Sequence, residues 1–97
     1  MKLVLRPEAE KDLAEAHAWY EKRASGLGAE FLAAVERVLE AIQDNPLRYP
    51  VIHQSIRRAL TRRFPYCVFF VYDRGAVSVL AVMHAARDPH KWRERTQ

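Results

Sequence analysis

The residues best suited to chemistry lie between positions 57 and 95. Arginines there can neutralise phosphate charge, and histidine is the side chain that exchanges a proton near neutral pH. Metal-independent cleavage of RNA needs a base for the 2′-hydroxyl, cations for the charged phosphorane, and an acid for the leaving 5′-oxygen. For such a reaction the chain offers Arg58, Arg63, His84, Arg87 and His90.

The same residues also have simple structural interpretations. A run of arginines beside a strand often only keeps a sheet edge solvated. Asp88, the one nearby carboxylate, precedes Pro89 and is expected to cap a short helix. Trp92 is expected to anchor that helix to the sheet, because a large ring buries much apolar area. The four histidines and the lone cysteine show no metal-binding spacing, so we expect no metal and no cofactor.

Charge is divided unevenly along the chain. Residues 57–97 hold nine Lys/Arg and three Asp/Glu, a balance of +6, whereas residues 1–56 hold seven and nine, a balance of −2. A basic half that also forms strands predicts a cationic face on a rigid platform. Such a face suits an anionic partner, either nucleic acid or an acidic protein segment.

Length and composition indicate a globular chain. Its 97 residues predict a single domain over 1–97, and 49% hydrophobic with 29% charged residues is typical of a soluble protein. The longest apolar run, 76–83, is too short for a membrane span, and the N-terminus has no signal-peptide pattern. Cys67 lies within an apolar strand and cannot form an internal disulfide, so we expect a cytoplasmic protein with an unreactive thiol.

Hydrophobic periodicity predicts two helices in the first half. A short strand over 2–6 ends at Pro7, which is well placed as the first residue of a helix. Apolar residues then recur at helical spacing until 25–28, and a second, more regular stripe runs from Phe31 to Ile42. This second helix must end before Pro46. The connection is only a few residues long, so the helices should form an antiparallel hairpin.

The second half changes to strand patterns. Strands are predicted over 56–63, 66–72 and 76–83, with a turn at 73–75 and a short helix from Pro89 to Arg95. The strand over 76–83 is apolar on both faces, which is typical of a central strand. The fold class is therefore α+β: an N-terminal strand, and a helical hairpin packed on a mostly antiparallel four-stranded sheet, with a short C-terminal helix.

Several short motifs occur along this framework. They are Gly26-Leu27-Gly28 before the second helix, Asn45-Pro46 after it, Arg57-Arg58, Phe64-Pro65-Tyr66 and His84-x-x-Arg87-Asp88-Pro89-x-x-Trp92. In this order and spacing they resemble the RelE/ParE toxin superfamily, most closely its ParE-like branch. The resemblance covers essentially the whole chain.

The resemblance implies the toxin of a type II toxin–antitoxin or plasmid-stabilisation module. A cognate antitoxin would wrap its acidic or amphipathic C-terminal segment around the basic surface, in a toxin–antitoxin hetero-oligomer. The residues expected to bind it are Arg57, Arg58, Arg63, Arg87 and Trp92.

The superfamily implies two different activities. ParE-like toxins inhibit DNA gyrase, whereas RelE-like toxins cut messenger RNA on the ribosome and usually carry a tyrosine or histidine near the C-terminus. This chain has no tyrosine after Tyr72, which favours gyrase inhibition; His90 is the alternative for that role, but it precedes Trp92 in the predicted short helix. A RelE-like ribosome-dependent endoribonuclease and a small basic nucleic-acid-binding module are the alternatives.

Overall fold

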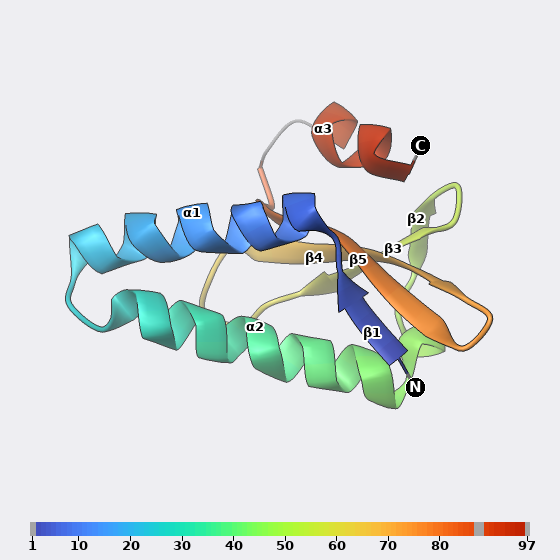
Figure 1. The fold of residues 1–97 in the computed structure, drawn as a ribbon, viewed down its shortest axis with the longest axis horizontal. Helices are drawn as coiled ribbons and strands as arrows, with labels where there is room; N and C mark the ends of the chain where they lie inside the picture. Colours follow the sequence, from blue (N-terminus) through green and yellow to red (C-terminus); the bar gives the residue numbers. More distant parts are fainter. Residues whose placement is uncertain (1, 87–88, 97) are drawn as a thin grey trace.

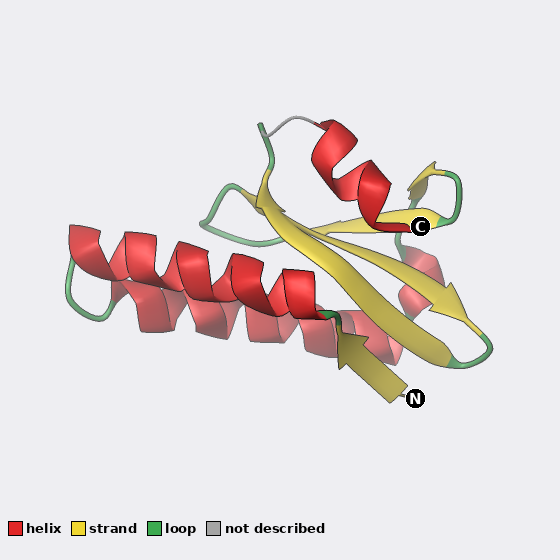
Figure 2. Cartoon of the chain, turned by 45° about the horizontal axis from the view of Figure 1, so that its top comes forward, coloured by secondary structure: helices red, strands yellow, loops and turns green. Residues whose placement is uncertain are grey.

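The computed structural model describes residues 2–86 and 89–96 (Figure 1). The order of elements is β1 (Lys2–Leu5), α1 (Pro7–Arg23), α2 (Leu27–Asp44), the 3-10 turn η1 (Pro46–Arg48), β2 (Val51–His53), β3 (Ile56–Leu60), β4 (Tyr66–Asp73), β5 (Ala76–His84), α3 (Pro89–Arg93) and η2 (Glu94–Thr96). The α+β prediction is confirmed. The hairpin of α1 and α2 lies on one side of the sheet and α3 on the other (Figures 1 and 2).

The helical hairpin is held at its bend by one carboxylate. The Glu21 side chain accepts hydrogen bonds from the backbone N–H groups of Gly26 (2.8 Å) and Gly28 (2.9 Å). It thereby provides a hydrogen-bond acceptor for amide groups that have no partner inside α2. These two bonds hold the pKa of Glu21 below its usual range. Gly26 adopts a φ of 88°, a left-handed conformation that glycine tolerates without steric cost.

The sheet has five strands in the order β1-β5-β4-β3-β2, so the prediction of four strands was one short. The missed strand, β2, is only three residues long, and its hydrophobic pattern is too short to read. It forms because a turn at Gln54, with φ 52°, returns the chain onto β3. β5 is an interior strand between β1 and β4, in agreement with its two apolar faces; β1 pairs with it in parallel, while the other pairs are antiparallel.

Strand β3 is shorter than predicted, because it ends at Leu60 rather than at Arg63. The Thr61 hydroxyl lies 2.7 Å from the carbonyl oxygen of Phe64 and 2.9 Å from that of Tyr66, and can donate to either. Arg63 has a φ of 72°, which no strand residue adopts. A tight turn, held by hydrogen bonds from the Thr61 hydroxyl, therefore replaces the last part of the expected strand.

Both faces of the sheet are covered. Between the hairpin and the sheet, Phe31 packs edge-on against Phe64 and Tyr66, with ring centroids 5.4 and 5.0 Å apart. On the opposite face, the predicted anchoring role of Trp92 is confirmed: it stacks on Phe69 at 4.6 Å with an interplanar angle of 9°. Cys67 is buried on this second face, as expected, and burial raises the pKa of its thiol.

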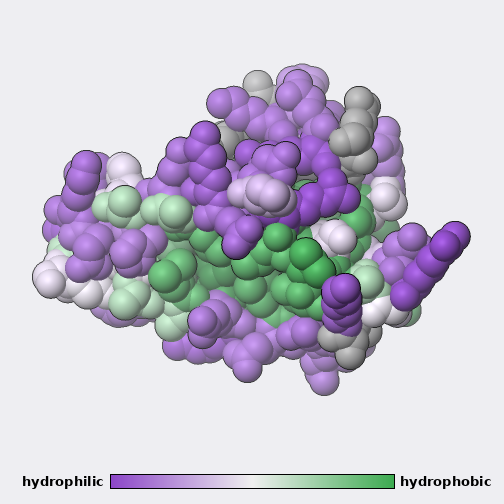
Figure 3. All heavy atoms as spheres, in the orientation of Figure 1, coloured by the Kyte–Doolittle hydropathy of each residue, from purple (hydrophilic) through white to green (hydrophobic). Residues whose placement is uncertain are grey.

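The face of the molecule drawn in Figure 3 has an apolar seam with hydrophilic residues on either side of it. Figure 3 shows hydrophobic residues gathered between α1 and α2, while hydrophilic residues line the outer sides of both helices. Among the described residues, no helix combines the length and hydrophobicity needed to cross a bilayer.

Candidate functional site

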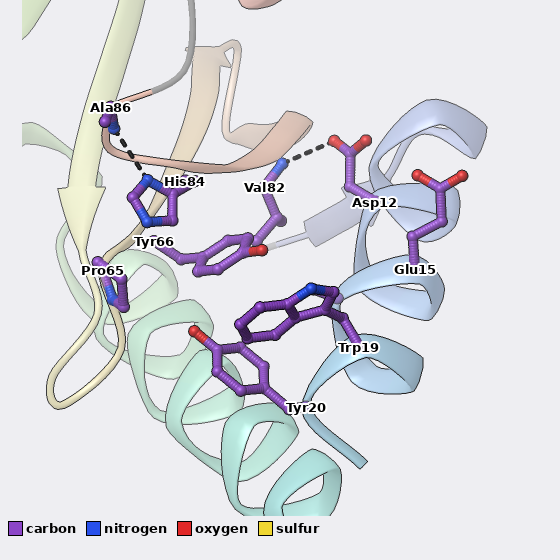
Figure 4. A pocket seen from close by; sticks show the side chains of 10 residues that line it. Asp12, Glu15, Trp19, Tyr20, Pro65, Tyr66, Val82, His84 and Ala86 are labelled. Atoms are coloured by element: carbon purple, nitrogen blue, oxygen red, sulfur yellow. Dashed lines mark hydrogen bonds between the residues drawn. The ribbon is translucent and has the colours of Figure 1, made fainter. Parts of the chain in front are cut away.

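A cavity of about 610 Å³ opens between α1 and the paired ends of β4 and β5 (Figure 4). One face of α1 forms a wall, since residues spaced three, four, seven and eight apart lie on the same side of a helix. The cavity is lined by Asp12, Glu15, Ala16, Trp19, Tyr20, Pro65, Tyr66, Val82, His84 and Ala86. Its volume is in the range of small-ligand sites, roughly 300–1,000 Å³.

Aromatic rings dominate the cavity. Trp19 packs edge-on against Tyr20, with ring centroids 5.0 Å apart. The ring centroid of Tyr20 lies 6.0 Å from that of Tyr66. Trp19 is 51% exposed, so a large apolar ring stands at the cavity mouth. Its ring already carries one cation, because the guanidinium carbon of Arg23 lies 4.1 Å from the ring centroid. Burial, and secondarily Tyr66, raise the pKa of Tyr20, so this phenol stays neutral at physiological pH.

His84 is the one predicted nuclease residue that the described structure places in this cavity. It ends β5, and its ring lies 5.6 Å from that of Tyr66. Its Nδ1 accepts a hydrogen bond of 3.1 Å from the Ala86 backbone N–H. In the neutral ring the proton is therefore on Nε2. The histidine can donate or exchange a proton through that atom, but its other nitrogen is already in use.

Asp12 is a residue whose role the sequence did not reveal. The sequence places it near the start of a helix, where negative charge favours the dipole, yet the structure uses its carboxylate across the sheet edge. The Asp12 carboxylate accepts a hydrogen bond of 2.9 Å from the Val82 N–H. The Arg95 guanidinium donates to both of its oxygens, at 2.6 and 3.3 Å. Arg95 also donates to the Leu80 carbonyl at 3.1 Å.

These contacts occur where β1 stops and the outer edge of β5 would otherwise be open. Asp12 accepts from the Val82 N–H and Arg95 donates to the Leu80 carbonyl, beyond the last residue pair of β1 and β5. The only sequence signal was an acidic residue on the same helical face as the aromatic ones.

The predicted arginines are not gathered at the cavity. Arg57 donates to the Tyr49 carbonyl at 2.6 Å on the hairpin side of the sheet. Arg63 pairs with Glu30 of α2 at 2.9 Å. Arg58 is exposed on the opposite side of the sheet, where its charge partly offsets the effect of burial on the pKa of Cys67. Alternation along β3 agrees, because Ile56 and Ala59 belong to different cores.

The other predicted residues lie on α3 or beside it. His90 is exposed on α3, and Trp92 is buried beneath it. Arg87, and the cap expected from Asp88, lie outside the described residues. Within the part of the chain that the structure describes, no His, Cys, Asp and Glu side chains are grouped to hold a metal ion. The cavity is thus aromatic and acidic, while the arginines that the structure describes are dispersed over the sheet edge and both faces.

Comparison with known proteins agrees with this fold. Residues 3–89 match the family described as "ParE toxin of type II toxin-antitoxin system, parDE". A solved chain of the "Chromosomal ParDE TA system from P. aeruginosa" is similar in fold, with a TM-score of 0.78 and 15% identity. The likeness covers 87% of this chain and 95% of that chain. A comparison with curated proteins finds no match. Because the family match spans most of its length, the chain belongs to the ParE toxin family of type II toxin–antitoxin systems.

Proposed function

We propose that this ParE-family chain acts as a toxin that inhibits DNA gyrase and that a cognate antitoxin neutralises it. One observation favours gyrase inhibition over cleavage of messenger RNA. His84 lies on the hairpin side of the sheet, whereas Arg58 lies on the other side and Arg63 is paired with Glu30. General acid–base catalysis requires its groups within hydrogen-bond reach of one reacting centre, and this dispersal does not provide that.

The charge around His84 supports the same choice. The acidic residues that line the cavity with His84 are Asp12 and Glu15, both on α1 (Figure 4). A cleavage site for RNA must stabilise added negative charge on phosphorus, for which cations are suited. Arg95 offsets the charge of Asp12, but Glu15 has no described cation beside it and would oppose added negative charge at this cavity.

The antitoxin surface is proposed to be the open edge of β3. β2 pairs only with Ile56 and Arg57, so beyond Arg58, whose N–H is bonded to Pro50, no described strand lies outside β3. Leu60 at this edge is 64% exposed, and Arg58 and Arg62 stand on either side of it. An exposed leucine between cations suits an acidic, partly apolar segment that adds to the sheet.

This surface revises the residue set expected from the sequence. The Arg57 side chain is hydrogen-bonded to the Tyr49 carbonyl and Trp92 is buried, so neither side chain is exposed for a partner in this structure. The similar fold of a chain from a ParDE system is consistent with a toxin that has such a partner.

The activity is tested on one preparation assayed in two ways. We expect the protein to inhibit supercoiling by gyrase, or to stabilise gyrase-cleaved DNA, and to leave messenger RNA on translating ribosomes intact. Arg87→Ala and His84→Ala are assayed alongside. Ribosome-dependent cleavage that is lost in Arg87→Ala, with no effect on gyrase, would replace this proposal with the ribonuclease. Activity in neither assay would favour another target or a binding module.

The antitoxin surface is tested with the protein encoded beside this chain. Arg58→Glu combined with Arg62→Glu should slow association on the order of tenfold at low salt and flatten its salt dependence. The control is Arg37→Glu on the exposed side of α2, which reverses one arginine charge and is compared with each single reversal, Arg58→Glu and Arg62→Glu. An unchanged rate in the double variant would show that docking occurs elsewhere.

A further inference from the structure

The cavity beside α1 has a composition that the proposed toxin function does not use. Three neighbouring aromatic rings, Trp19, Tyr20 and Tyr66, share it with two carboxylates, Asp12 and Glu15 (Figure 4). Aromatic faces are negative at the centre and attract cations, most strongly when the ring is Trp. Asp12 is paired with Arg95, so Glu15 supplies the negative charge that no described cation offsets. On a chain of net charge +4 this makes the cavity a locally acidic, aromatic site.

The ring at the cavity mouth already binds a guanidinium of this chain. Arg23 lies over Trp19, with its guanidinium carbon 4.1 Å from the ring centroid. A planar guanidinium stacks on an aromatic face in a way that an ammonium does not. The Trp19 ring therefore already stacks with one guanidinium, and its second face can take another.

The carboxylate at the other end also binds a guanidinium. Arg95 holds both oxygens of Asp12, at 2.6 and 3.3 Å. Glu15, three residues further along the same side of α1, has no hydrogen bond or ion pair to any described residue. Within the described part of the chain, Glu15 is thus an unpaired carboxylate between the two occupied positions.

We propose that this cavity binds an arginine side chain presented by a partner protein, with Glu15 as the ion-pairing group and Trp19, Tyr20 and Tyr66 as the surrounding rings. The volume of about 610 Å³ leaves room for a guanidinium and for part of the polypeptide segment that carries it. Charge complementarity selects a basic residue, and the planar rings select arginine over lysine. The inference is independent of which target the toxin inhibits.

The test uses the full chain and two blocked tripeptides, acetyl-Gly-Arg-Gly-amide and acetyl-Gly-citrulline-Gly-amide. The pair has nearly the same shape and differs in charge. Titration is followed by amide and indole chemical shifts. We expect the arginine peptide to bind with a Kd on the order of 1 mM, a value reasonable for a ligand of this size. Shifts should concentrate at the Trp19 indole and the His84 amide, and the citrulline peptide should bind about tenfold more weakly.

Two variants test the roles of the acid and the ring. Glu15→Gln should weaken arginine binding about tenfold, as for a lost charge-assisted contact. Trp19→Leu should weaken it about two- to fivefold, as for an exposed cation–π contact. Glu36→Gln removes the same charge from exposed α2 and should change nothing. Both Glu15 and Trp19 are exposed, so these variants are expected to stay folded, which the spectra report directly.

Three results would overturn the inference. They are equal binding of the citrulline and arginine peptides, equal losses in Glu15→Gln and Glu36→Gln, and shifts spread over the acidic surface rather than the cavity. None of these results would bear on gyrase inhibition or on antitoxin binding at β3.

Discussion

Replacing Asp12 with alanine should destabilise the protein more than any other change to an acidic residue on α1. The Asp12 side chain is 8% exposed, and it satisfies the Val82 N–H and the guanidinium of Arg95. Leaving a buried backbone N–H without a partner costs about 1–3 kcal/mol, and a lost hydrogen bond to a charged group about 1.5–3 kcal/mol. Arg95 is 22% exposed and can turn partly to water, which reduces the second contribution.

We therefore expect Asp12→Ala to lower the free energy of unfolding by about 3 kcal/mol. For a chain of this length, 1 kcal/mol corresponds to about 4–8 °C in Tm, so the melting temperature should fall by about 12–24 °C. Asp12→Asn keeps an acceptor for Val82 and should cost about 1–2 kcal/mol.

Urea unfolding followed by circular dichroism measures these changes, with Glu10→Ala as the control on the exposed side of α1. A double-mutant cycle with Arg95→Ala isolates the contact between the two side chains. A loss below about 0.5 kcal/mol in Asp12→Ala, the range of ordinary surface sites, would refute the role assigned to this carboxylate.

Three further changes test the packing of the hairpin. Phe31→Ala removes a fully buried ring and should cost about 3–5 kcal/mol in urea unfolding; a loss under about 1 kcal/mol would contradict the packing of α2 on the sheet. Gly28→Ala should lose about 1–3 kcal/mol despite better helix propensity, because a Cβ there would lie 2.7 Å from the His17 ring and 2.8 Å from its carbonyl oxygen; a gain in stability would show that the helices can separate. The folded-state pKa of Glu21 is lowered, so its contribution is present above the unfolded carboxyl pKa and lost as pH falls through the folded value. The stability difference between the natural protein and Glu21→Gln should accordingly shrink below about pH 4, and a difference that stays constant with pH would argue against those backbone bonds.

Much of the fold is local in origin and therefore readable from the sequence. Pro7 and Pro46 mark where α1 begins and where α2 must already have ended, because proline fixes φ and disfavours helix in the residue before it. Regular apolar spacing identified the face of α2 that packs on the sheet. The two-residue turn at Arg74 and Gly75, both with positive φ, joined two strands whose apolar runs were plain.

The candidate site was predictable only in part. His84 could be recognised because it ends an apolar strand and is of a type that titrates. Its companions could not, since they come from α1, about 65 residues earlier, and meet it only after the helix has packed beside β5. Arg57 and Arg58 are neighbours in sequence but point to opposite faces of β3, as side chains in a strand must, so the structure does not bring them together on one face.

Sequence alone determined the α+β class, the helical hairpin, the interior position of β5 and the superfamily resemblance, because proline positions, hydrophobic period and motif order are properties of short segments. Tertiary structure decided what those segments meet. It placed Asp12 and Arg95 at an edge left open when β1 ends, stacked Trp92 on Phe69 in the second core, and gathered rings and carboxylates into one cavity. Such long-range contacts depend on the packing of whole elements, and no local pattern in the chain encodes them.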